Sequence, residues 1–100
     1  MTRKVFWSED ALTDLQKIFE FIARDNVQNA HLVADRIEHL IALLAEVPFG
    51  KQGRMINTYE AIVPKTPFII AYQLAKDNSL NIARVIHGAR NWQEGEWPNE

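Results

Sequence analysis

Two amphipathic segments joined by almost no linker constrain the fold of this chain most. In residues 8–25, apolar side chains recur at helical spacing after Ser8, whose hydroxyl suits a helix N-cap. A second apolar stripe of the same period runs from Asn26 to about Glu46. Because Asn26 can end one helix and cap the next, the sequence predicts an antiparallel helical hairpin.

The segments on both sides of the hairpin are rich in β-branched and aromatic residues, which favour strands. The glycine-containing stretch 50–54 lacks the spacing of a phosphate-binding loop and predicts a turn. The order of elements is therefore β-α-α-β-β-β. This order predicts an α+β fold in which the helical hairpin packs on one face of a small, mainly antiparallel sheet. The expected strands are 4–7, 54–63, 68–74 and 80–87.

The composition excludes several classes of protein. At 100 residues the chain is long enough for one domain, which we place at 1–92, followed by an acidic tail at 93–100. The absence of cysteine excludes disulfide scaffolds, and no apolar run reaches the ~20 residues of a membrane span. We therefore expect a cytoplasmic protein with no membrane association. The net charge of −2 argues against a protein that coats nucleic acid, so we expect no sequence-specific nucleic-acid binding by the chain alone.

The predicted sheet has more apolar surface than one helical hairpin can bury. Strand 68–74 is apolar on both faces, and strand 80–87 repeats this pattern. Phe21 lies off the apolar stripe of its helix. We expect an exposed apolar patch that a protein partner covers. The alternative is that the tail, through Trp92 or Trp97, folds over the second face.

The sequence offers no nucleophile–base arrangement, so we expect no catalytic residue. His31, Asp35 and His39 have the spacing of metal ligands, but they fall opposite the apolar stripe of their helix. We interpret them as a solvated face and expect no metal or other cofactor. Glu60 is central in its strand, and we expect it to form a structural ion pair with Arg84 across the sheet.

Two blocks of sequence, 63–70 and 84–92, resemble the RelE/ParE superfamily of bacterial toxins, and the ParE branch in particular. The first block reads Val-Pro-Lys-Thr-Pro-Phe-Ile-Ile, and the second contains Arg-Val-Ile-His-Gly-Ala-Arg. The likeness covers nearly the whole chain. It implies the toxin of a type II toxin–antitoxin module, which arrests growth and is neutralised by a cognate antitoxin that wraps its surface.

The two branches of the superfamily imply different activities. ParE-like members inhibit DNA gyrase without a hydrolytic site, whereas RelE-like members are ribosome-dependent mRNA endoribonucleases. Ile69 stands where the nuclease branch typically has arginine, and no tyrosine follows Arg90. The resemblance therefore favours a gyrase inhibitor. The alternatives are a RelE-like endoribonuclease and an attenuated toxin that only binds its antitoxin.

The resemblance and the residue pattern together give two sets of candidate site residues. The candidates for target binding are Arg54, Arg84, His87, Arg90 and Trp92. The candidates for antitoxin binding are Phe21, Ile69, Ile82 and Ile86.

Overall fold

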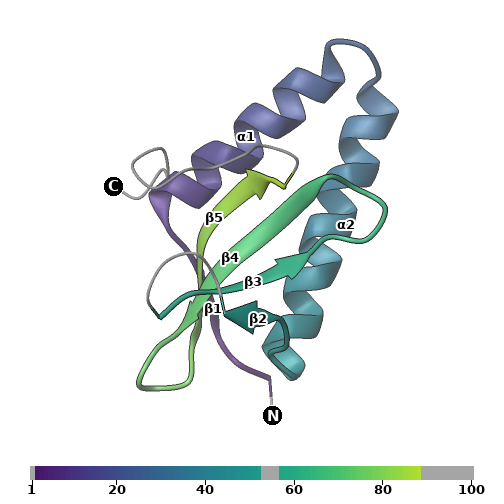
Figure 1. Ribbon diagram of the computed structural model, residues 1–100. Helices are drawn as coiled ribbons and strands as arrows, with labels where there is room; N and C mark the ends of the chain where they lie inside the picture. The colour runs from purple at the N-terminus through teal and green to yellow at the C-terminus, as the bar shows by residue number, and fades with distance from the viewer. Residues whose placement is uncertain (1, 53–56, 89–100) are drawn as a thin grey trace.

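The fold consists of a helical hairpin on a five-stranded sheet (Figure 1). The structure is a computed structural model, and it describes residues 2–52 and 57–88. The elements are β1 (Val5–Trp7), α1 (Glu9–Ala23), α2 (Val27–Glu46), β2 (Lys51–Gln52), β3 (Tyr59–Ile62), β4 (Phe68–Leu74) and β5 (Leu80–His87).

The predicted helical hairpin is confirmed, and the capping residues explain where its helices begin. The Ser8 hydroxyl accepts a hydrogen bond from the Ala11 amide at 3.0 Å, and it caps α1. The Asn26 side chain accepts one from the Asn29 amide at 3.0 Å and caps α2. The short link holds the two helices antiparallel (Figure 1).

The sheet has the strand order β1-β5-β4-β3-β2. β1 pairs parallel with β5, and the other neighbours pair antiparallel, so the prediction of a mainly antiparallel sheet is confirmed. The bounds of β4 and β5 are those predicted. The strand expected at 54–63 is shorter among the described residues, where β3 spans only Tyr59–Ile62.

The short strand β2 corrects the prediction of a simple turn at residues 50–54. Lys51 and Gln52 pair with Glu60 and Tyr59 of β3. Gly50 makes this close approach possible, because it has a φ of +120° and a Cβ there would lie 2.5 Å from the Glu60 carbonyl oxygen.

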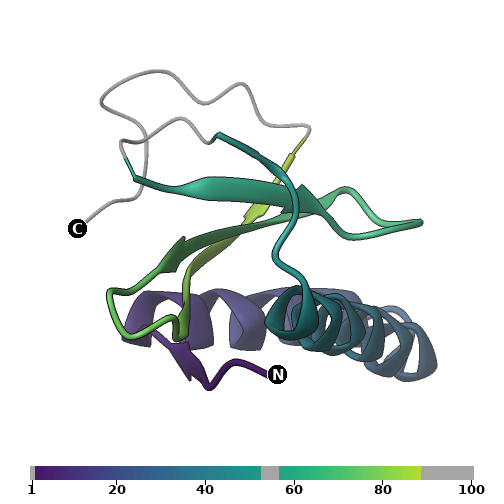
Figure 2. The same cartoon turned by 90° about the horizontal axis from the view of Figure 1, so that it is seen from below.

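The core lies between the sheet and the two helices, which cover the same face (Figure 2). α2 contributes fully buried residues such as Ile37 and Leu44, and β4 contributes Ile70 and Tyr72. These side chains are apolar at helical spacing on α2 and at alternate positions on β4. The helical face of the sheet is therefore sealed by the hairpin, as the sequence predicts.

A bulge in β5 turns Ile82 into the core, although its prediction as an antitoxin contact requires a surface position. Ala71 pairs with Arg84, but its neighbour Tyr72 pairs with Ile82, so Ala83 is an extra residue in the ladder. The bulge places Ile82 and Val85 together in the core. Since Ile82 is fully buried there, its prediction as an antitoxin contact is wrong.

The second face of the sheet is more buried than the sequence predicts. Ala71 and Ile86 are only 0% and 3% exposed, so the expected exposed apolar patch does not extend over the middle of the sheet. Ala71 is a small residue that pairs with Glu60 on one side and Arg84 on the other, and both neighbours are larger. Ile62, near the sheet edge, is 67% exposed. The suggested cover by Trp92 or Trp97 concerns residues outside the described part of the chain.

Tyr72 predicts how stability depends on alkaline pH. Its hydroxyl donates a hydrogen bond to the Phe49 carbonyl, and its ring stacks on Tyr59. Burial, and to a smaller extent repulsion from Tyr59, raises the pKa of Tyr72 above its usual 10.0. The folded state therefore favours the neutral phenol of Tyr72. The stability that this hydroxyl contributes is lost as the pH rises above about 10. In Tyr72→Phe we expect a loss of about 1 kcal/mol at neutral pH and a shallower decline above pH 10.

Urea unfolding of the wild type and Tyr72→Phe across the alkaline range measures both effects. An equally steep alkaline decline in the two proteins would contradict the assignment to Tyr72.

Candidate functional site

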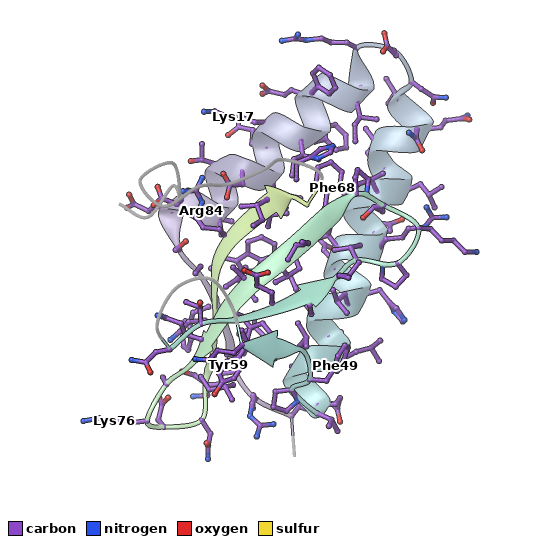
Figure 3. The ribbon with its side chains drawn as sticks, viewed as in Figure 1. Lys17, Phe49, Tyr59, Phe68, Lys76 and Arg84 are labelled. Carbon is purple, nitrogen blue, oxygen red and sulfur yellow. The ribbon has the colours of Figure 1, made fainter. Side chains whose placement is uncertain are left out.

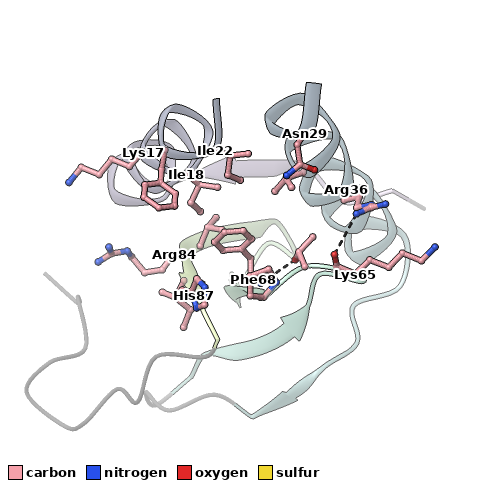
Figure 4. Close-up of a pocket in the computed structure, with 15 residues that line it drawn as sticks. Lys17, Ile18, Ile22, Asn29, Arg36, Lys65, Phe68, Arg84 and His87 are labelled. Carbon is pink, nitrogen blue, oxygen red and sulfur yellow. Dashed lines mark hydrogen bonds between the residues drawn. The ribbon is translucent and has the colours of Figure 1, made fainter. Parts of the chain in front are cut away.

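A groove of about 590 Å³ lies where the helical hairpin meets the ends of β4 and β5 (Figure 4). α1 and α2 form one wall, and the segment 65–67 with the last residues of β5 forms the other. The groove is lined by Lys17, Ile18, Phe21, Ile22, Asn29, Val33, Arg36, Lys65, Thr66, Pro67, Phe68, Arg84, Val85, Ile86 and His87.

The groove has an apolar lining from both layers of the fold. Ile18 and Ile22 lie on the apolar stripe of α1, and Phe21 lies beside that stripe, three residues after Ile18. Phe21 is 69% exposed, although it is a large aromatic side chain. Phe68 contributes a buried ring from the start of β4. The arrangement suits a ligand that inserts apolar side chains.

Basic side chains surround this apolar lining. Lys17, Arg36, Lys65 and Arg84 line the groove, whereas no carboxylate does so among the described residues. Arg36 also donates a hydrogen bond to the Lys65 carbonyl at 3.5 Å, which holds the β3–β4 turn against α2 (Figure 4). The local field of the groove therefore favours an acidic partner, despite the negative net charge of the chain.

The β3–β4 turn is held in place by its own hydrogen bonds. The Thr66 hydroxyl donates to the Val63 carbonyl at 3.0 Å and accepts from the Phe68 amide at 3.1 Å. The Phe68 carbonyl in turn accepts from the Val63 amide at 2.9 Å. This wall of the groove is therefore preorganised, so a ligand need not order it on binding.

Arg84 is held at the α1 side of the groove by Asp14. Its Nε and Nη2 each lie 2.7 Å from an oxygen of the Asp14 carboxylate, and both side chains are largely buried. The expected pair of Arg84 with Glu60 is therefore wrong in its acidic partner. The reason is topological, because β4 separates β3 from β5 and places Ala71 between the two residues. Figure 3 shows Arg84 beside α1 and Tyr59 near the opposite edge of the sheet.

The structure brings together some of the predicted site residues. Phe21, Arg84, Ile86 and His87 all line the groove, and His87 is exposed with its ring packed edge-on against Phe68. They remain predictions as target or antitoxin contacts. Half-buried Ile69 and buried Ile82 do not line the groove. The predicted target contacts Arg54, Arg90 and Trp92 lie outside the described residues.

Four charged residues at this site were not among the residues predicted from the sequence, namely Asp14, Lys17, Arg36 and Lys65. Helical spacing contained a signal for two of them. Asp14 and Lys17 lie seven and four residues before Phe21, so they share its face of α1. The positions of Arg36 and Lys65 depend on how the β3–β4 turn meets α2, which no local pattern specifies.

The residues with metal-ligand spacing form a solvated face, as predicted. His31, Asp35 and His39 are all exposed on α2. Across residues 2–52 and 57–88, no group of three potential ligands is placed to hold a metal ion. Neither of the described helices is long and apolar enough to span a bilayer.

Comparison with known proteins identifies the family. The model of the ParE toxin of type II toxin–antitoxin systems matches residues 5–92. Y4kP of Sinorhizobium fredii, a protein named as a toxin, is 33% identical over 96 residues, which cover 94% of this chain and 98% of that protein. Toxin RelE2 of Caulobacter vibrioides is 33% identical over 88 residues, which cover 87% and 97%.

A solved structure shows the same fold. The structure of the chromosomal ParDE system from P. aeruginosa superposes with a TM-score of 0.76 at 17% identity, covering 86% of this chain and 96% of that one. The family model covers most of the chain, and two relatives match it over nearly their whole lengths. The chain therefore belongs to the ParE toxin family of type II toxin–antitoxin systems.

Proposed function

We propose that this chain is a ParE-type toxin that inhibits DNA gyrase in the cytoplasm and is neutralised by a cognate antitoxin. The groove between the hairpin and the sheet is the proposed docking site for the antitoxin. The observation that carries this assignment is the combination of an apolar lining with four basic side chains and no lining carboxylate among the described residues.

The groove predicts the chemistry of the antitoxin segment. Its apolar residues, led by the exposed ring of Phe21, favour a segment that inserts aliphatic or aromatic side chains. Lys17, Arg36 and Lys65 favour acidic residues next to them. The segment we propose is therefore acidic and amphipathic, and it is encoded by a short reading frame adjacent to that of the toxin.

The state of Arg84 supports gyrase inhibition over RNA cleavage. An RNA-cleaving site stabilises the negative charge that develops on the phosphate, and this requires available cationic donors. Asp14 already accepts two hydrogen bonds from the Arg84 guanidinium. Ile69, at a position that is typically arginine in the nuclease branch, supplies no cation either.

Purified toxin added to DNA gyrase tests the proposal. We expect inhibition of supercoiling and accumulation of cleaved DNA at micromolar toxin, both reversed by the antitoxin. A cell-free translation reaction with the same toxin should proceed normally. Unchanged supercoiling and cleavage with folded toxin would contradict the proposal.

A RelE-like endoribonuclease is the second candidate. Two observations favour it. One relative is named Toxin RelE2. The groove mouth, which we define as the end of the groove lined by Lys17, Arg84 and His87, carries basic side chains. This function would arrest translation with mRNA cuts at defined codon positions. Arg84→Ala should then abolish the cuts, whereas a gyrase inhibitor should give no cuts with either protein.

A further inference from the structure

The Asp14 carboxylate occupies the place of an anionic ligand on Arg84. Oδ2 accepts from Arg84 Nε at 2.7 Å and from the Val85 amide at 3.0 Å. Oδ1 accepts from Arg84 Nη2 at 2.7 Å. A planar guanidinium binds a carboxylate and a phosphate with this same two-point geometry. The contact is thus of the kind that a bound phosphate would make.

Arg84 lies in surroundings that would otherwise suit a phosphate. Lys17 and His87 line the same groove as Arg84. Figure 4 shows the Lys17 and Arg84 side chains extending toward the same side of the groove. Lys17 also follows Asp14 by one helical turn on α1. Release of Arg84 from Asp14 would therefore make the Arg84 end of the groove more positive, next to Lys17.

The contact between Asp14 and Arg84 is supported by hydrogen bonds that join the start of α1 to β5. Ser8, which caps α1, donates from its amide to the Ile82 carbonyl at 3.0 Å and from its hydroxyl to the Ala83 carbonyl at 2.8 Å. Together with the Val85 amide on Asp14, these bonds fix the first half of α1 along β5. Asp14 is thus held next to Arg84. An external phosphate must therefore displace a carboxylate that is already in place.

We propose that Asp14 is a positioning residue that acts as a built-in anion, holding Arg84 against α1 and preventing the groove mouth from binding nucleic-acid phosphates. The inference rests on the proposed function in treating the groove as the binding surface of the toxin. The inference adds that Asp14 prevents nucleic acid from binding to this surface, so that only protein partners bind there. Its experiment uses neither gyrase nor antitoxin, so its failure is distinguishable from failure of the proposed function.

The experiment compares RNA binding by the wild type and Asp14→Asn, using fluorescence anisotropy of a short, labelled single-stranded RNA. Asparagine has nearly the same shape, but it lacks the charge that pairs with Arg84. We expect Asp14→Asn to bind about tenfold more tightly at low salt, as one added charge-assisted contact would give. The slope of log K against log salt concentration should steepen by about 0.7, the value for one more neutralised phosphate of a single strand.

Two matched variants separate the role of Arg84 from a change in net charge. Asp10→Asn alters the charge of the same helix by the same amount, but Asp10 lies in the first turn of α1 and does not line the groove. It should bind RNA within about twofold of the wild type, since its added charge is remote and screened. Asp14→Asn combined with Arg84→Gln should return to the wild-type affinity and salt slope. Equal binding by Asp14→Asn and Asp10→Asn would overturn the proposal.

A measurement on the wild type keeps the proposal testable if Asp14→Asn fails to fold. The Nε proton of Arg84 should give an NMR signal that keeps its chemical shift when the same RNA is added. A shift of that signal that saturates with RNA would show that Arg84 binds phosphate in the presence of Asp14, and it would overturn the proposal.

Discussion

Replacing Phe21 by aspartate is expected to weaken antitoxin binding by about a hundredfold, which corresponds to the roughly 2–4 kcal/mol of an interface hot spot. The ring is 69% exposed in the chain alone, and it lines the groove. An antitoxin segment in the groove would bury it. The aspartate removes that apolar contact and places a negative charge opposite a partner that we expect to be acidic. Isothermal titration calorimetry with purified antitoxin measures the change.

Leu12→Asp is the matched control for this variant. Leu12 lies on the same helix, is 52% exposed and does not line the groove. Its replacement introduces the same charge on a similar apolar site, so we expect antitoxin affinity to stay within about threefold of the wild type, as for a contact outside the hot spot. An equal loss of affinity in both variants would argue against the groove as the docking site.

Leu44→Ala is expected to lower the free energy of unfolding by about 2–5 kcal/mol. Leu44 is fully buried on α2 within the main hydrophobic core. Truncation to alanine removes buried methyl groups and leaves a cavity that the rigid helix–sheet junction fills poorly. For a chain of this size, the loss corresponds to a fall in the melting temperature of roughly 10–30 °C, and circular dichroism measures it.

The neighbouring leucine provides the control. Leu43 is 46% exposed on the same helix, so Leu43→Ala should cost less than about 1 kcal/mol because little apolar area leaves the interior. The two variants have the same composition. Similar melting temperatures for them would contradict the packing of α2 on the sheet.

The helices and two of the strands were predictable because local signals suffice for them. Ser8 and Asn26 cap the helices, and each helix has one continuous apolar stripe. Strands β4 and β5 are long, mainly apolar runs between turn residues, so their bounds follow from the local sequence. The strand β2 was missed because it has only two residues, and its pairing depends on the close approach of Gly50 to Glu60.

The orientation of the β5 side chains was not predictable from alternation. The extra residue at Ala83 shifts the alternation of side chains along β5, so that Ile82 and Val85 both lie in the core. A bulge leaves no clear mark in a single sequence. The predicted partner of Arg84 was wrong for a different reason, because β4 separates β3 from β5 and Asp14 lies 70 residues away along the chain.

The candidate site was predictable only in part. The off-stripe position of Phe21 marks it as an exposed apolar residue, and the structure confirms its exposure. The sequence did not show that Arg36 and Lys65 would meet Lys17 around one groove. That meeting depends on the packing of α2 against the β3–β4 turn.

Methyl NMR of the toxin during titration with its antitoxin shows whether the groove is the docking site, because it reports which apolar side chains the partner contacts. The groove should give the largest changes in chemical shift, at the methyl groups of Ile18, Ile22 and Val85. The exposed methyl groups of Leu12 and Leu43, which lie outside it, should change little. Changes confined to these two leucines, with the groove unaffected, would contradict docking of the antitoxin in the groove.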